Sequence, residues 1–407
     1  MTSAQTAWLL YDFANAAYAL IVRTVFAPLC IKLCADGVVS SGDATSCWGM
    51  TASVSGIIAG ALSIFLGRFC DIRRCRKKVF SFFVILGVLS TYGFAFCGKG
   101  DFYSAVSMAF ISMGCYLCAN SLYDSLLLDV SPRSKRDRMS VLGYALGYVG
   151  GVIPFLVCLA LSFVMSDKTS AMRWSFVIAG TWWMVLTLPL LFFVRERKRK
   201  ESCQAPFWQA AKEVWRNKNV RNFLIAYFLY IDGVGTIYLM ATPIATDIGI
   251  SQAALLGTIL GLQFYAFPCT LLYGALAKRF GSVRMILFAI ATYVAASLLV
   301  GVMPSMPSAT AKLVIFIVLA VIIGSSQGGI QSLSRSYYSK IIPPQKAAEY
   351  FGFYNLFGKF TTVVGPVLVF IMVKLAGCSE YGILLLVFPF TAGAVMLWRV
   401  SGKTGRF

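Results

Sequence analysis

The chain has 407 residues, of which 58% are hydrophobic and only 13% are charged. Such a composition cannot cover a soluble globule of this length with polar surface, so we expect a membrane-embedded protein. The formal net charge of +20 would suggest nucleic-acid binding in a soluble protein, but most of the basic residues lie in short loops, where membrane topology and anionic lipid headgroups account for them.

Twelve apolar segments follow one another along the chain, and each is about long enough to cross a bilayer as a helix. Helices are expected because backbone polar groups cannot stay unpaired in lipid. The alternating short segments typical of a barrel are not seen. The predicted spans are 7–33, 48–67, 79–97, 102–129, 139–165, 174–194, 221–246, 251–277, 284–303, 312–338, 349–375 and 380–399.

The basic residues alternate between the connections. The even-numbered connections and the C-terminal tail hold 28 of the 36 Lys and Arg residues. Because basic residues accumulate on the cytoplasmic side, both termini and the central loop are predicted to be cytoplasmic. We therefore expect a multi-pass protein of the cytoplasmic (inner) membrane.

The central connection, 195–220, begins with a run of five basic residues and one acid, Arg195 to Lys200. Apolar residues between 206 and 215 then recur near helical spacing. This pattern leaves two interpretations open, a short helix on the membrane surface or a simple polar linker. In either case we predict an N-terminal bundle of six helices at 1–194 and a C-terminal bundle at 221–407.

The two bundles repeat each other. The loop that begins Gly67-x-x-x-Asp71 is matched 207 residues later by one that begins Gly274-x-x-x-Lys278. The pairs Pro132/Gly147 and Pro343/Gly358 share a spacing of fifteen, and Tyr11-Asp12 corresponds to Tyr230-x-Asp232. Parallel repeats of this kind build transporters whose site lies between the halves near the bilayer midplane.

Charged and amide side chains are concentrated in particular segments. The first, fourth, seventh, tenth and eleventh contain them, whereas the third, sixth, ninth and twelfth lack charges in their cores and are predicted to face lipid. Because intramembrane polar groups mark solute pathways, we predict a substrate or ion route lined by Asp12, Asn15, Arg23, Asn120, Asp124, Asp232, Gln327, Gln331, Asn355 and Lys359.

Structural roles compete with this interpretation at several positions. Asp129 and Arg335 lie near a membrane boundary, where they would anchor loops. Asp232 and Lys359 would form a buried ion pair. Arg23 would either extend its side chain toward an interface or bind an anionic group of the substrate.

The loop after the second segment resembles the signature loop of the major facilitator superfamily, in which an Asp and basic residues latch the cytoplasmic face. The sequence departs from that pattern at Arg74 or Cys75, where a Gly is expected, and at Lys278, which replaces the Asp. An identical latch in both halves is therefore not expected. The predicted gate-loop residues are Gly67, Asp71, Arg73, Arg76, Gly274 and Arg279.

Longer motifs are similar to the vacuole-effluxer-like branch of that superfamily, which includes the autophagy-related vacuolar amino-acid permease and its bacterial relatives. They begin at Tyr11, Gly143, Gln327 and Phe351, and they cover both halves of the chain. The resemblance implies the twelve-helix major facilitator fold and solute transport, with amino-acid export as the best-described activity.

We therefore expect a secondary transporter that works by alternating access. Small residues at Gly143, Gly147, Gly151, Gly352, Gly358 and Gly365 would let backbones slide at the interface. If transport is proton-coupled, Asp12 or Asp232 is the preferred carrier, because burial favours the protonated carboxyl. Otherwise the expected partners are a small solute and membrane lipid, with a monomeric protein and no cofactor or metal.

Three alternatives remain at this point. A multidrug or lipid-like amphiphile exporter would use the 14% aromatic residues to line an apolar cavity. A transport-inactive receptor or scaffold would tolerate neutral residues at every buried charge. An intramembrane enzyme is disfavoured because the chain has no histidine to serve as a base.

Cys34 and Cys47 share an external loop and could form a disulfide in an oxidising compartment.

Overall fold

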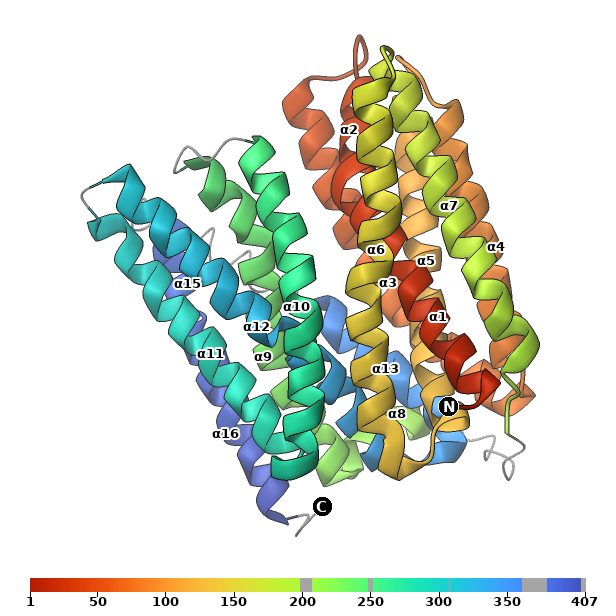
Figure 1. Ribbon diagram of the computed structural model, residues 1–407. Coiled ribbons are helices and arrows are strands. Elements are labelled where there is room, and N and C mark those ends of the chain that lie inside the picture. Colours follow the sequence, from red (N-terminus) through yellow and green to blue (C-terminus); the bar gives the residue numbers. More distant parts are fainter. Residues whose placement is uncertain (198–206, 248–251, 307, 361–378, 404–407) are drawn as a thin grey trace. The chain divides into compact units, whose positions relative to one another are not determined.

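Every regular element that the structure describes is helical. The structure is a computed structural model, and it describes residues 1–197, 207–247, 252–306, 308–360 and 379–403. In Figure 1 the helices of the N-terminal half are red to yellow-green, and those of the C-terminal half are green to blue. The all-α class predicted from the sequence is confirmed.

Ten helical stretches in the described residues are long and apolar enough to cross a membrane. They correspond to the first six predicted spans and to the eighth, ninth, tenth and twelfth. The seventh predicted span forms helix α9 (Lys218–Asp247), which has 30 residues. The eleventh begins as α13 (Ala347–Phe360), and the remainder of that span, including Gly365, lies outside the described residues.

Two compact units make up the chain, and the first consists of Met1–Arg133, Leu146–Cys203 and Pro343–Leu356. Its helices are α1 (Ser3–Ala17), a π-helical run (Tyr18–Phe26), α2 (Ala27–Cys34), α3 (Ser41–Arg73), α4 (Arg76–Gly93), α5 (Phe102–Val130), most of α6 (Arg136–Val164), α7 (Lys168–Phe193) and the start of α13. Short 3-10 turns lie at Phe94–Phe96, Arg133–Lys135 and Pro344–Lys346.

The second unit consists of Ser134–Ala145, Gln204–Ile342 and Phe357–Phe407. Its helices are the start of α6, α8 (Phe207–Arg216), α9, α10 (Gln252–Phe280), α11 (Ser282–Val302), α12 (Ala309–Ile341), the end of α13, α15 (Ser379–Leu384) and α16 (Val387–Lys403). A 3-10 turn at Met303–Ser305 follows α11.

Polar side chains at the helix starts supply partners for backbone N–H groups that have none within the helix. Thr2 and Gln5 form a reciprocal capping box at α1. The Ser40 hydroxyl accepts a hydrogen bond from the Asp43 N–H at α3, and the Asp167 carboxylate accepts two at α7. These caps set where the spans begin.

The same helix neighbours occur in both units. In the first unit α4 packs against α5 and α7, α3 against α5, and α1 against α7. In the second unit α11 packs against α12 and α16, α10 against α12, and α9 against α16. When the spans of each half are numbered from one to six, the contacting pairs have the same numbers in both halves. These matching pairs are what the duplicated helical unit predicted from the sequence requires, while the predicted bundle boundaries remain a prediction.

Each unit also includes a short segment from the other half of the sequence. The first turns of α6, Ser134–Ala145, belong to the second unit, and the first turns of α13, Pro343–Leu356, belong to the first. Both helices follow a proline and a 3-10 turn at an offset of 211 residues.

The central connection contains the short helix α8, so the helical interpretation of that region is confirmed. Val214 is buried on one side of it, while Lys212 and Arg216 are exposed on the other. Its Trp215 ring packs edge-on against Phe357, with 6.2 Å between the ring centroids. The helix is thus amphipathic and attached to the second unit.

Large apolar side chains remain exposed on the four spans that lack charges in their cores. They include Phe82 and Leu89 on α4, Phe192 on α7, Phe288 on α11 and Trp398 on α16. Exposed apolar surface on this scale is what contact with lipid tails requires. These helices are the ones expected to face lipid.

Candidate functional site

A buried hydrogen-bond network joins α1 to α5. Asn15 donates to the Asn120 side-chain oxygen at 2.9 Å, and the Tyr11 hydroxyl donates to the same oxygen at 3.1 Å. The Tyr116 hydroxyl donates to the Asn15 side-chain oxygen at 3.2 Å. Buried polar groups are stable only when they are paired, so this network fixes the facing sides of the two helices. We call Tyr11, Asn15, Tyr116 and Asn120 the α1–α5 network.

Stacked aromatic rings adjoin this network. Tyr18 stacks on Tyr116 with 4.7 Å between ring centroids, and Trp183 lies 5.1 Å from Tyr18. Toward the start of α1, Trp8 stacks on Tyr123 at 4.6 Å. The rings create an apolar surrounding in which hydrogen bonds and charges act more strongly than in water.

Three charged side chains act on the network. Arg23, Asp12 and Asp124 all lie within electrostatic range of the Tyr116 hydroxyl. Asp124 is 9% exposed and accepts a hydrogen bond from Asn355 of α13 at 3.4 Å. The first unit therefore brings together Asp12, Asn15, Arg23, Asn120, Asp124 and Asn355.

The first span is not a regular α-helix. Tyr18–Phe26 forms a π-helix, and Thr24 donates a side-chain hydrogen bond to the carbonyl of Ala19, five residues earlier. A π-helical turn contains more residues than an α-helical turn. The α-helical spacing that would place Asp12 and Arg23 on one face therefore does not hold beyond Ala17.

Glycines of α6 let its backbone approach α1 closely. A Cβ atom added at Gly147 would lie 3.4 Å from the Asp12 carbonyl oxygen, and one added at Gly151 would lie 3.0 Å from that of Ala16. Small residues permit this close approach between helices in membranes. α6 thus fixes the backbone that carries Asp12 and Asn15.

The predicted site residues of the second unit are placed separately. Asp232 on α9 is 2% exposed, and its backbone carbonyl accepts a hydrogen bond from Thr236. Gln327 and Gln331 on α12 and Lys359 on α13 are half-buried. The proposed ion pair between Asp232 and Lys359 remains a prediction.

A second group of charges surrounds Arg76 at the start of α4. Its guanidinium lies 2.9 Å from Asp129, 3.5 Å from Glu196 and 3.8 Å from Asp71. Arg76 is only 4% exposed, so its charge depends on these carboxylates for compensation. The backbone N–H of Lys77 also donates to Glu196, which draws the end of the α7 span to the same place.

The start of α13 completes this group. The Glu349 N–H donates to the Asp71 carboxylate at 2.9 Å, and the Glu349 side chain lies 3.3 Å from Arg68. A Cβ atom on Gly67 would overlap the Ala348 carbonyl, so α3 and α13 meet backbone to backbone there. We call this group the Asp71 cluster, and it comprises Arg68, Asp71, Arg76, Asp129, Glu196 and Glu349.

A third polar group lies where the start of α6 meets α11 and α12. Asp137 accepts hydrogen bonds from Ser282 at 3.0 Å and Ser336 at 2.6 Å, and it pairs with Lys340. Arg335, which is 2% exposed, donates to the Ser140 hydroxyl at 2.8 Å. We call this group the Asp137 cluster, and it comprises Asp137, Ser140, Ser282, Arg335, Ser336 and Lys340.

The gate-loop residues predicted from the sequence lie in several different places. Gly67, Asp71 and Arg76 belong to the α3–α13 contact or the Asp71 cluster, whereas Arg73 is exposed. A Cβ atom on Gly274 would meet the Val141 side chain at 2.6 Å, and Arg279 lies over the Phe280 ring. The partners Glu196 and Asp137 were not predicted. Each is a lone acid within a basic run, and that pattern is the signal that could have identified them.

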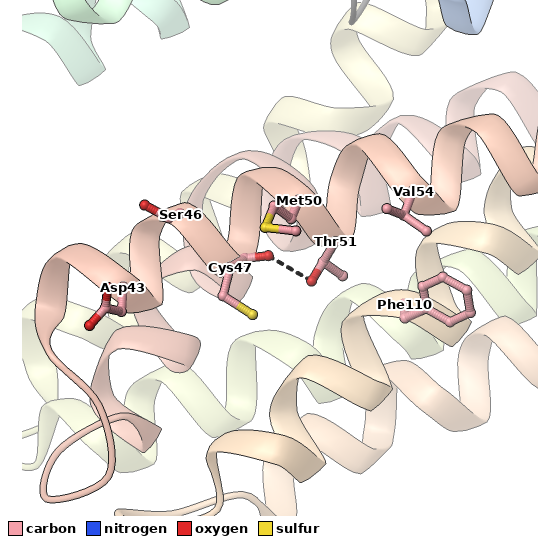
Figure 2. Close-up of a pocket in the computed structure, with 7 residues that line it drawn as sticks. All are labelled: Asp43, Ser46, Cys47, Met50, Thr51, Val54 and Phe110. Carbon is pink, nitrogen blue, oxygen red and sulfur yellow. Dashed lines mark hydrogen bonds between the residues drawn. The ribbon is translucent and has the colours of Figure 1, made fainter.

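A pocket of about 430 Å³ lies at the start of α3, away from these groups. Figure 2 shows its lining and the hydrogen bond from Thr51 to the Cys47 carbonyl. Asp43 is its only charged residue, and the other lining residues are Ser46, Cys47, Met50, Thr51, Val54 and Phe110.

Cys34 and Cys47 are both free thiols. The described residues contain no cluster of acids and cysteines suited to a metal ion.

The sequence is similar to known membrane proteins along its whole length. The family model described as "Vacuole effluxer Atg22 like" matches residues 2–130 and 128–407. The uncharacterized MFS-type transporter YxiO of Bacillus subtilis (strain 168) is 36% identical over 417 residues, covering 99% of this chain and 96% of YxiO. Autophagy-related protein 22-2 of Aspergillus clavatus is 28% identical over 264 residues, which are 57% of this chain and 42% of the fungal protein.

Solved structures with the same fold share little sequence with it. The proton:xylose symporter XylE has a TM-score of 0.76 at 15% identity, covering 98% of this chain and 95% of that one. The human organic anion transporter MFSD10 has a TM-score of 0.76 at 14% identity, covering 97% and 99%. XylE is a protein of the major facilitator superfamily, and at this identity the likeness of both structures concerns the fold alone.

Proposed function

The chain belongs to the vacuole effluxer Atg22-like family and is an MFS-type membrane transporter, and on that basis we propose that its solute is a small zwitterion of the amino-acid class. Export from the cytoplasm by alternating access is part of the proposal. The basic residues of the even-numbered connections support an orientation with both termini in the cytoplasm.

The α1–α5 network is the observation that supports the solute class. It places amide and hydroxyl groups from four side chains beside two carboxylates and one guanidinium. Polar groups of both charges in an apolar surrounding suit a solute that carries both charges. A solute without charge would gain nothing from Arg23.

The Asp71 and Asp137 clusters support alternating access. Each joins the first turns of one helix to helices from the other half of the sequence. Contacts made of ion pairs and short hydrogen bonds have discrete formed and broken states, as a two-state transporter requires. We propose that both clusters hold the cytoplasmic ends closed and separate when those ends open.

A transport screen tests the solute class. Purified protein in proteoliposomes would be assayed with radiolabelled amino acids, with and without a proton gradient. We expect uptake or counterflow of at least one amino acid, reduced at least tenfold in Asn120→Ala. Asn219→Ala is the matched control, because Asn219 is exposed at the start of α9. Failure of every amino acid to be transported would refute the solute class.

Proton coupling is a separate part of the proposal, carried by Asp12 or Asp232. Asp12 contributes to the charge around the Tyr116 hydroxyl, and Asp232 is almost fully buried. Replacing the coupling residue by Asn should leave exchange of solute intact but abolish its response to a proton gradient. A residue whose Asn variant still responds normally is not the carrier.

The pocket in Figure 2 favours one second candidate, the export of a cationic amphiphile. Its lining combines one carboxylate, Asp43, with apolar and sulfur-containing side chains. The same proteoliposomes would then expel a lipophilic cation, and Asp43→Asn would weaken that export. Transport of amino acids unaffected by such cations would rule this candidate out.

A further inference from the structure

We propose that Arg23 binds the carboxylate of the transported solute and that the π-helical run in the first span positions it for that purpose. This inference rests on the proposed function, and it adds a requirement that the solute carry an anionic group.

Arg23 differs from the other arginines that are buried or half-buried in the helices. Arg76 contacts three carboxylates, and Arg335 donates to Ser140 and lies 4.5 Å over the Tyr144 ring. Arg23 is half-buried, yet no residue in the described part of the chain forms an ion pair or hydrogen bond with its side chain. An intramembrane arginine without a counter-ion is costly. A bound anion removes that cost.

The surroundings of Arg23 point to the interior of the unit. Its charge acts on the hydroxyls of Tyr18 and Tyr116, which are 1% and 8% exposed. Tyr116 in turn donates to Asn15 of the α1–α5 network. An anion held by Arg23 would therefore adjoin the network, because the same hydroxyl connects the two.

The π-helix is an independent indication of a functional position. Arg23 is the only charged residue in Tyr18–Phe26, and the Ala27 N–H that follows the run bonds to the carbonyl of Val22, again five residues back. π-helical turns are rare and are frequently found at functional sites. The wider turn also rotates Arg23 away from the face of Asp12 that regular spacing would give it.

Spacing along the helix shows which charge of the solute each residue can bind. Eleven residues separate Asp12 from Arg23, which would correspond to roughly 16 Å at the rise of an α-helix, and the π-helical run from Tyr18 shortens this distance somewhat. The two charges of an α-amino acid are much closer together, so one molecule cannot reach both residues. With its carboxylate on Arg23, the ammonium is therefore bound by groups other than Asp12.

The test compares an amino acid with its carboxamide in the proteoliposome assay. The probes are the best-transported amino acid and the same compound with its carboxylate amidated. Wild-type protein should prefer the amino acid by at least tenfold, and Arg23→Gln should abolish that preference. Arg23→Lys should restore part of it, because an ammonium binds a carboxylate without the two-pronged geometry of a guanidinium. Lys32→Gln, an exposed basic residue of the same span, should leave the preference unchanged.

The outcomes separate this inference from the function on which it rests. If no amino acid is transported by the wild type, the proposed function fails. If amino acids are transported but Arg23→Gln keeps the wild-type preference over the carboxamide, the inference alone is overturned. If Arg23→Gln does not fold, Arg23→Lys is the deciding variant. A preference for the carboxylate and an affinity for the amino acid that both equal those of the wild type would contradict a bidentate contact with Arg23.

Discussion

The Asp71 and Asp137 clusters occupy corresponding places in the duplicated chain but use different chemistry. In the first, Arg76 is surrounded by Asp71, Asp129 and Glu196. In the second, one carboxylate, Asp137, is held by two serine hydroxyls and by Lys340. Lys278 stands at the position of the second half that corresponds to Asp71. The carboxylate of the second cluster is supplied by α6, at Asp137, instead. Duplication therefore preserved the helix contacts and not the side chains that make them.

The backbone shows the same divergence at the two loops. Arg74 ends α3 with φ 54°, and Gly281 precedes α11 with φ 89°, at an offset of 207 residues. Only glycine adopts positive φ without steric cost. The two backbones differ in ψ, which is 46° at Arg74 and 149° at Gly281. The second loop therefore has a glycine where φ is positive, whereas the first has an arginine.

The largest effect is expected from Gly67→Ala. The added Cβ atom would overlap the Ala348 carbonyl and lie 2.8 Å from the Glu349 nitrogen, and backbone atoms cannot move aside. We expect a loss of about 3 kcal/mol of stability together with loss of transport. The control is Gly56→Ala in the same helix, where nothing lies within 4 Å. Thermal unfolding in detergent measures both, and equal melting temperatures would contradict the backbone contact.

Removing one carboxylate from each cluster tests their unequal chemistry. Asp129→Asn removes the nearest of the three carboxylates around the buried Arg76, while Asp71 and Glu196 remain, so the change should cost about 2 kcal/mol. Asp137 has 21% of its side chain exposed, so water can replace its partners, and Asp137→Asn should cost about 1 kcal/mol. Unfolding of the two variants in parallel gives the difference. Equal losses would show that the clusters are energetically alike.

Ser140→Ala tests the serine contacts directly. Arg335 is almost fully buried and donates to the Ser140 hydroxyl, so the change should cost about 1–3 kcal/mol. Ser339→Ala is matched to it, because the Ser339 hydroxyl bonds only to the carbonyl of Ser336 on its own helix among the described residues. A similar melting temperature for the two variants would argue against a structural role for Ser140.

The smallest effect is expected from Arg74→Gly. Glycine relieves the positive-φ cost and should stabilise the protein by about 1 kcal/mol. The change at the second loop, Gly281→Ala, should destabilise the protein by about 1–3 kcal/mol, because φ 89° and ψ 149° lie in a region that is essentially restricted to glycine. A destabilised Arg74→Gly protein would indicate that contacts of the Arg74 side chain outweigh the strain.

The sequence was sufficient to predict the helices and two of the four residues of the α1–α5 network, Asn15 and Asn120. Apolar length defines a span, and spacing of four residues places Tyr116, Asn120 and Asp124 on one helix face. The π-helix could not be predicted, because nothing in the apolar composition of Tyr18–Phe26 distinguishes one helical hydrogen-bond pattern from another. Glu196 was missed for a different reason. Its partner Arg76 is 120 positions earlier, and the surrounding basic run was interpreted only as a sign of topology.

The central claim is that the α1–α5 network binds the transported solute. Equilibrium binding of the best-transported amino acid to purified protein tests it without depending on conformational change. We predict at least tenfold weaker binding to Asn120→Ala than to wild type, with Asn219→Ala unchanged. Wild-type affinity in a correctly folded Asn120→Ala protein would contradict the claim and place the solute elsewhere.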